Sequence, residues 1–306
     1  MNVSSAERLA LAQKLAPYYC ANPKVAAVAV AGSVALGNAD RFSDIDLAVY
    51  WSLAPTDQER RAIIKRATRR HAPLITSHVE EACWSEIYEV DGFAIDVRHM
   101  DVETTRRILA DVLERSDPSL SKQWHLATLL SALPLADSSA VLTDWQSQAQ
   151  NYPHALSVTM VREHLGFPPA WEQEQLAERS ELLALYESFC NVEQQMLLVL
   201  MGLNSLYYPG WLWVDRLIAQ MRIAPPKLAA RYKQVFGIAS IDPLASVYQL
   251  HGLVDETFRL VRTHLPELDI THARARFQER SRDSHIGNPN TLHCRCESQN
   301  CRIDSR

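Results

Sequence analysis

The chain has 306 residues, of which 47% are hydrophobic and 22% are charged. A chain of this size and composition is long enough to form two hydrophobic cores. Its formal net charge of −5 disfavours duplex nucleic acid as a partner and suits a cationic ligand better. No run of about 18 apolar residues occurs and the N-terminus lacks a signal-peptide pattern, so we expect a cytoplasmic protein with no membrane partner.

The N-terminal part of the chain alternates between helical and strand patterns. Ser4 to Glu7 has the form of a capping box, and apolar residues at helical spacing follow it as far as Pro17, which predicts an opening helix. Later apolar or alternating runs predict strands, and Asp91-Gly92 between two of them is a strong hairpin signal. After the first helix we expect strands at 24–31 and 44–51, a helix at 56–71, and paired strands at 84–90 and 93–100.

From about residue 103 onward, the apolar residues recur at steps of three and four, which predicts helices. The clearest helical stripes run over 182–203 and 244–265. Residues 116–119 (Ser-Asp-Pro-Ser) are typical of a turn, and the apolar period fades after residue 271. We therefore predict the α+β class, with an α/β domain at 1–118, an all-α helical bundle at 119–270 and a mobile tail at 271–306.

Three aspartates occupy strand positions that one sheet could bring together. Asp44 and Asp46 are two residues apart on a predicted strand, so both side chains point to the same face. Asp96, in an apolar strand, can supply a third carboxylate from a neighbouring strand, although it could instead be a strand-end residue satisfied by Arg98. Ionised carboxylates in one small volume repel each other and need positive charge, and hard oxygen ligands suit Mg²⁺ held together with substrate phosphates. These three aspartates are therefore predicted metal ligands and catalytic residues.

Gly32 and Ser33 close the first predicted strand, and ten residues separate Ser33 from Asp44. Glycine lets the backbone approach a phosphate closely. Ser33, at the start of the following helix, offers a hydroxyl and N–H groups at a positive helix end. We expect this turn to hold the β- and γ-phosphates of a nucleotide.

The ordered set of Gly32-Ser33, the spacer, Asp44-Ile45-Asp46 and a later acidic strand residue resembles the signature of the nucleotidyltransferase superfamily, which has a polymerase-beta-like fold. The similarity covers residues 24–100. The helical part, with Leu-Asn-Ser-Leu-Tyr-Tyr-Pro-Gly-Trp at 203–211, resembles an uncharacterised bacterial branch that is similar in layout to aminoglycoside and lincosamide adenylyltransferases. The resemblance implies a mixed sheet with flanking helices, ATP or another NTP as substrate, Mg²⁺ on the three aspartates, and nucleotide contacts from Gly32, Ser33 and Ser43.

Two further groups of residues have alternative explanations. One group of polar and aromatic residues could line an acceptor or base pocket, or could pack at a helix junction. Its members are Asn204, Tyr207, Tyr208, Trp211 and Trp213. The spacing of the tail cysteines matches no standard zinc site, so we expect exposed thiols at Cys294, Cys296 and Cys301.

The remaining cysteines and basic groups are expected to be structural. Cys20, Cys83 and Cys190 lie among apolar or helical neighbours, which predicts reduced and buried thiols. The Arg-Arg-His run at 69–71 is typical of a solvated helix end. His251 lies within an apolar stripe and is predicted to be a packed core histidine.

The function that fits this pattern best is transfer of a nucleoside monophosphate, with AMP from ATP favoured, onto a hydroxyl acceptor such as an aminoglycoside-type antibiotic. Transfer to a protein or an RNA is an alternative, and it would need a basic channel that the composition does not indicate. A catalytically degenerate, NTP-binding regulatory or antitoxin-like protein is a third possibility. The sequence leaves the acceptor, the base preference and the oligomeric state open.

Overall fold

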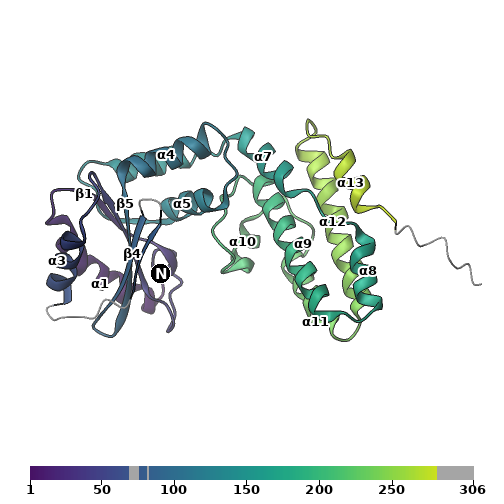
Figure 1. The fold of residues 1–306 in the computed structure, drawn as a ribbon, viewed down its shortest axis with the longest axis horizontal. Coiled ribbons are helices and arrows are strands. Elements are labelled where there is room, and N and C mark those ends of the chain that lie inside the picture. The colour runs from purple at the N-terminus through teal and green to yellow at the C-terminus, as the bar shows by residue number, and fades with distance from the viewer. Residues whose placement is uncertain (69–75, 81–82, 281–306) are drawn as a thin grey trace, which may run out of the picture.

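A computed structural model describes residues 1–68, 76–80 and 83–280 of the chain (Figure 1). Six strands within these residues form one sheet, in the order β3-β4-β5-β2-β1-β6. β2 and β5 are parallel and the other neighbouring pairs are antiparallel, so the sheet is mixed, as predicted. The strands are β1 (Val25–Val30), β2 (Ile45–Trp51), β3 (Thr76–Glu80), β4 (Cys83–Val90), β5 (Phe93–Asp101) and β6 (Leu133–Ala136).

The hairpin between β4 and β5 has the turn that its sequence predicts. Asp91 and Gly92 have φ angles of 52° and 81°, and a two-residue type I′ turn needs positive φ at both positions. Two strands were not predicted. β3 pairs with β4, and the four-residue β6 pairs with β1 at the opposite edge of the sheet, where Pro134 is tolerated.

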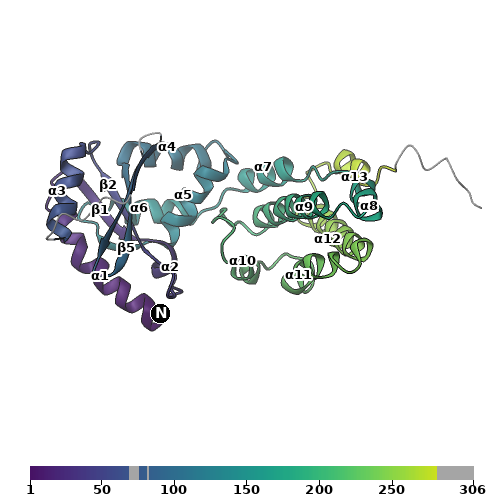
Figure 2. The ribbon, with the colours of Figure 1, turned by 60° about the horizontal axis from the view of Figure 1, so that its bottom comes forward.

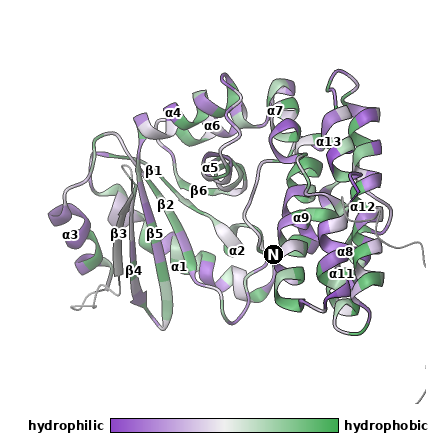
Figure 3. Ribbon diagram, turned by 45° about the vertical axis from the view of Figure 1, so that its right-hand side comes forward, coloured by the Kyte–Doolittle hydropathy of each residue, from purple (hydrophilic) through white to green (hydrophobic). Residues whose placement is uncertain are grey.

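Helices cover both faces of the sheet (Figure 2). One face packs against α1 (Val3–Cys20) and α3 (Asp57–Thr68), with Leu47 and Val97 in the shared core. The other face is covered by three helices between the sheet and the rest of the chain, and Tyr50 of this face packs edge-on against Trp145 at 5.3 Å. Figure 3 shows mostly hydrophobic residues along β2 and hydrophilic ones on the outer helix α3. The three covering helices are α4 (Val102–Leu113), α5 (Leu120–Ser131) and α6 (Val141–Ala149).

The opening helix differs from its prediction at both ends. Asn2 is the N-cap, because its side-chain oxygen accepts from the Ser5 N–H at 2.8 Å. The prediction that the helix ends near Pro17 is wrong, since α1 continues to Cys20. Tyr19 in its last turn is buried, and its hydroxyl is 2.7 Å from that of Tyr88 on β4. This tertiary contact stabilises a turn that proline alone would weaken.

The helical part contains the two long helices that periodicity predicts, at nearly the predicted residues. Its hydrophobic core is continuous with the core between the sheet and α4 to α6. Pro168-Pro169, Pro209-Gly210 and Pro225-Pro226 all lie between helices, where proline does not cost a hydrogen bond. The helices are α7 (His154–His164), α8 (Ala170–Glu178), α9 (Leu182–Leu203), α10 (Val214–Gln220), α11 (Leu228–Ala239), α12 (Pro243–His264) and α13 (Thr271–Phe277).

The domain boundaries at residues 118 and 270 stay predictions, and two observations bear on them. After residue 118 the chain returns to the sheet and adds β6 to its edge. The segment from 271, predicted as a mobile tail, begins with α13, whose Phe277 is buried beside Phe167 and Phe258. Residues 281–306, which include the three tail cysteines, lie outside the described residues, as do residues 69–71.

The prediction that Cys20, Cys83 and Cys190 are buried is wrong for two of them. Cys20 and Cys190 are exposed, while Cys83 is half-buried. Cys190 follows the fully buried Phe189 on α9 and therefore points to the outer side of that helix. Within the described ranges, the helices are too short or too polar to cross a bilayer.

Candidate active site

The three predicted aspartates converge at one end of the parallel strand pair. Asp46 on β2 is directly paired with Asp96 on β5, and Asp44 immediately precedes β2. One carboxylate oxygen from each of the three lies within 4.8 Å of those from the other two. All three residues are half-buried. The sheet register thus brings together hard oxygen ligands of the kind that a divalent cation such as Mg²⁺ prefers.

Gly32 lies directly against this cluster. The Ala31 N–H donates to the Asp46 carbonyl at 2.9 Å, which holds the end of β1 beside β2. Gly32 has a φ of +59°, and a Cβ at this position would be only 1.9 Å from Asp46 Oδ2. A side chain would therefore strain the backbone and collide with a carboxylate of the cluster. This position requires glycine for two independent reasons.

Ser33 follows in α2 (Gly32–Ala35), a helix of only four residues. Its hydroxyl oxygen is buried and has no hydrogen-bond partner among the described residues. A buried hydroxyl without a partner is costly in a finished fold, because it has lost its water. An oxygen-rich ligand beside Gly32 and Ser33 would satisfy it, which agrees with the predicted phosphate contact.

Ser43 has a different setting from the one predicted. Its hydroxyl accepts from the Asp40 N–H at 2.9 Å and lies 3.1 Å from an Asp40 carboxylate oxygen. The buried Arg8 donates through Nε to the Ser43 carbonyl at 2.9 Å, and its guanidinium lies over the Phe93 ring. Ser43 and Arg8 therefore fix the turn that leads into Asp44. Nucleotide contact by Ser43 stays a prediction.

The electrostatics of the cluster are those of repelling carboxylates in a partly dry site. Burial, and then the charges of Asp44 and Asp96, raise the pKa of Asp46 from 3.8 to about 7. Burial likewise raises the pKa of Asp96, and the positive charge of Arg98 opposes the shift in both groups. No ion pair within 4 Å joins Asp96 to Arg98 in the described part of the chain, although the Arg98 charge lowers the pKa of Asp96, and the roles predicted for Asp96 stay predictions. A cation between these oxygens would relieve the repulsion.

The residues at 204–213 are mostly structural. The Asn204 side chain bonds to the backbone of Leu200, Arg222 and Ile223, which ties the end of α9 to the segment after α10. Tyr207 is buried and donates to the carbonyl of Ala149 at 3.1 Å.

The turn over residues 208–211 is different, because it approaches the sheet side of the molecule. Tyr208 and Trp211 pack edge-on at 5.0 Å, and a Cβ added at Gly210 would lie 3.9 Å from the Trp124 ring of α5. Trp213 lies beyond this turn and is 45% exposed. Sequence analysis did not identify Trp124, because a single tryptophan in a helix gives no functional signal.

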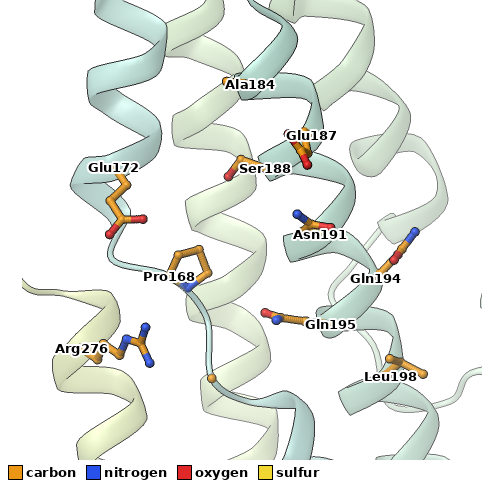
Figure 4. A pocket seen from close by; sticks show the side chains of 11 residues that line it. Pro168, Glu172, Ala184, Glu187, Ser188, Asn191, Gln194, Gln195, Leu198 and Arg276 are labelled. Carbon is orange, nitrogen blue, oxygen red and sulfur yellow. The ribbon is translucent and has the colours of Figure 1, made fainter. Parts of the chain in front are cut away.

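A cavity of about 560 Å³ lies elsewhere, between α8, α9 and α13 (Figure 4). Its lining includes the polar side chains of Glu172, Gln195 and Arg276, and the oxygen of the Gln195 amide is buried without a partner among the described residues. Figures 1 and 2 place these helices at the end of the molecule away from the sheet. Beside it, His251 is mostly buried and bonds to Gln173 at 2.9 Å, and burial lowers its pKa to about 4, as a packed histidine would show.

Replacing Asp46 with asparagine should stabilise the metal-free protein in a pH-dependent way. The folded-state pKa of Asp46 is raised, so the folded protein binds more protons and this group costs stability as the pH rises from about 4 to about 7. Asp46→Asn should therefore increase the free energy of unfolding by roughly 1–3 kcal/mol at about pH 8 and by little at about pH 4.

This prediction is checked by urea unfolding of both proteins across that range in a buffer with chelator. The exposed Glu178→Gln on α8 serves as the control and should show no such trend. A gain from Asp46→Asn that does not change with pH would contradict the raised pKa.

Two parts of the chain match known protein families. A family model described as a nucleotidyltransferase domain matches residues 12–91, and one described as a domain of unknown function (DUF4037) matches residues 120–214. A nucleotidyltransferase-like protein of known structure from Exiguobacterium sibiricum 255-15 is similar at 12% identity and a TM-score of 0.42, over 84% of this chain and 78% of that one. No curated protein matches the chain. The chain therefore contains a nucleotidyltransferase domain, followed by a DUF4037 domain.

Proposed function

We propose that the protein is a metal-dependent nucleotidyltransferase that transfers AMP from ATP to a hydroxyl group of a small acceptor. The observation that carries this proposal is the convergence of Asp44, Asp46 and Asp96 within 4.8 Å, beside a glycine that leaves no room for a side chain. The nucleotidyltransferase family model over residues 12–91 supports nucleotide transfer in general. The choice of ATP and of Mg²⁺ is part of the proposal.

The residues present fit a divalent cation. Three carboxylates supply oxygen ligands, their mutual repulsion is a reason to bind positive charge, and the orphaned Ser33 hydroxyl lies at the adjoining turn. Asp44, Asp46 and Asp96 would hold the ion. When bound, Mg²⁺ would neutralise charge on the triphosphate and polarise the phosphate under attack.

The side chains of this chain would then carry out positioning and proton transfer. Gly32 and Ser33 would hold the β- and γ-phosphates, so that the α-phosphorus faces the acceptor. The acceptor oxygen would attack that phosphorus, the bond to the bridging oxygen would break, and pyrophosphate would leave. Asp96 would take the hydroxyl proton on a carboxylate oxygen that is not used to hold the metal.

For the acceptor, we propose a small polyhydroxylated cation of the aminoglycoside type. The formal net charge of −5 favours a cationic acceptor over a polyanionic one such as RNA. The DUF4037 description gives no acceptor, so a direct screen is needed.

Nucleotide binding should depend on both magnesium and the aspartates. In calorimetric titrations, ATP with Mg²⁺ should bind the wild type, and Asp44→Asn combined with Asp46→Asn should weaken this binding at least roughly tenfold, because the metal-linked contacts are lost. Pyrophosphate release should require both ATP and an acceptor from a panel of aminoglycosides. Absence of NTP binding to the wild type would contradict the proposal, and binding without any turnover across the panel would favour a regulatory NTP-binding protein.

Gly32→Ala should disable the site. The new Cβ would be forced against Asp46 Oδ2 in a left-handed backbone conformation, so we expect at least a tenfold loss of ATP affinity and a loss of more than about 1 kcal/mol of stability. The matched control is Gly237→Ala, in an exposed part of α11 with open space around its Cβ position. Wild-type ATP affinity in Gly32→Ala would show that the nucleotide binds elsewhere.

A further inference from the structure

Arg98 is a charged residue beside the carboxylate cluster, and the sequence predicted no role for it beyond a possible pairing with Asp96. It lies on β5 two residues after Asp96, so both side chains point to the same face of the sheet. It is half-buried, and its charge acts on Asp46 as well as on Asp96. Arg98 is thus placed at the border between the cluster and the helices that cover this face.

The guanidinium of Arg98 lies over an aromatic ring and has no hydrogen-bond partner among the described residues. Its central carbon lies 4.3 Å from the centre of the Trp124 ring on α5. Within the residues that the structure describes, no hydrogen bond or ion pair uses its five N–H donors. An arginine that rests on an aromatic face keeps its N–H edges available, and its planar fork matches the oxygens of a phosphate.

The helical part of the chain supports this tryptophan. Gln123, next to Trp124, is buried, and its side chain accepts from the Tyr208 N–H at 3.3 Å and donates to Met160 Sδ. The turn at 208–211 passes beside the indole, because a Cβ added at Gly210, which has a φ of +91°, would lie 3.9 Å from the Trp124 ring. The surroundings of Arg98 therefore come from β5, from α5 and, behind Trp124, from the turn between α9 and α10.

We propose that Arg98 binds a phosphate group of the nucleotide, and that Trp124, backed by the turn at 208–211, positions it for that contact. This inference rests on the proposed function, since it needs a nucleotide at the carboxylate cluster. The three aspartates supply negative charge and require a metal before they can hold a triphosphate. Arg98 is a positively charged side chain of the protein itself, and it lies on the side of the site that faces the helical part. The matched segment 120–214 contains both Trp124 and the turn, so the DUF4037 domain contributes to the nucleotide site.

The alternative is that Arg98 only offsets the repulsion among the aspartates. The two roles differ in what happens to ATP binding when the charge is removed. If Arg98 binds phosphate, Arg98→Gln should weaken binding of ATP with Mg²⁺ by roughly 10- to 100-fold. The same variant should bind Mn²⁺ alone as tightly as the wild type or more tightly, because one positive charge near the ligands is gone. If Arg98 only offsets the repulsion, Mn²⁺ should again bind at least as tightly, but ATP affinity should not fall. If Arg98 only maintains the geometry of the cluster, both affinities should fall together.

Calorimetric titration of Mn²⁺ alone, and of ATP with Mg²⁺, tests this on the full chain. Arg98→Lys, which keeps the charge, should recover part of the ATP affinity, and Trp124→Leu should lose roughly 3- to 10-fold of it, while Trp124→Phe stays closer to the wild type. The control Arg107→Gln removes a positive charge from an exposed position on α4 and should change neither affinity. Thermal unfolding of each variant identifies any that fails to fold.

The outcomes separate this inference from the proposed function. ATP affinity that falls in Arg98→Gln with Mn²⁺ affinity retained supports the phosphate contact. Unchanged ATP affinity, or an equal loss of ATP and Mn²⁺ affinity, overturns it and leaves the proposed function standing. A wild-type protein that binds neither Mn²⁺ nor ATP overturns both.

Discussion

The repulsion among three carboxylates at the start of a parallel strand pair is the constraint on which the rest of the site depends. The register of β2 and β5 sets Asp46 beside Asp96, and Asp44 joins them from the residue before β2. In the absence of a cation this arrangement costs stability, since burial and like charge raise the pKa of Asp46 to about 7. The proposed function places a divalent cation and phosphate oxygens at this cluster and the adjoining glycine turn.

One end of this sheet face carries the half-buried aspartates, and helices cover the other end. Along β2 and β5, the face that carries Asp46 and Asp96 continues to Tyr50 and Met100, which are buried under the covering helices. Arg98 stands between these two regions, on the ring of Trp124. The core that begins here runs without interruption into the helical part. The helical part is thus connected to the site by packing. A change in the turn at 208–211 is therefore expected to shift Trp124 and, with it, the position of the Arg98 guanidinium.

The sequence predicted the elements that carry strong local signals. The Gly32-Ser33 turn, the i, i+2 aspartates, the Asp91-Gly92 hairpin and the two long helices all follow from periodicity or turn chemistry. β3, β6 and the last turn of α1 did not follow, because pairing and packing with distant residues decide them. The position of Arg98 on the Trp124 ring could not be predicted for the same reason, since only the tertiary fold brings Trp124 and Gly210 near it. For Ser43, the motif predicted a nucleotide contact but not the structural role of its hydroxyl, which accepts a hydrogen bond within the turn before Asp44.

The most direct test of the account is to locate the metal. Crystals grown with Mn²⁺ and a non-hydrolysable ATP analogue would be measured for anomalous scattering from manganese. The account predicts a manganese peak within coordination distance of the carboxylates of Asp44, Asp46 and Asp96, with the triphosphate between it and Gly32-Ser33. An ordered analogue bound elsewhere, with no manganese at the three carboxylates, would contradict it.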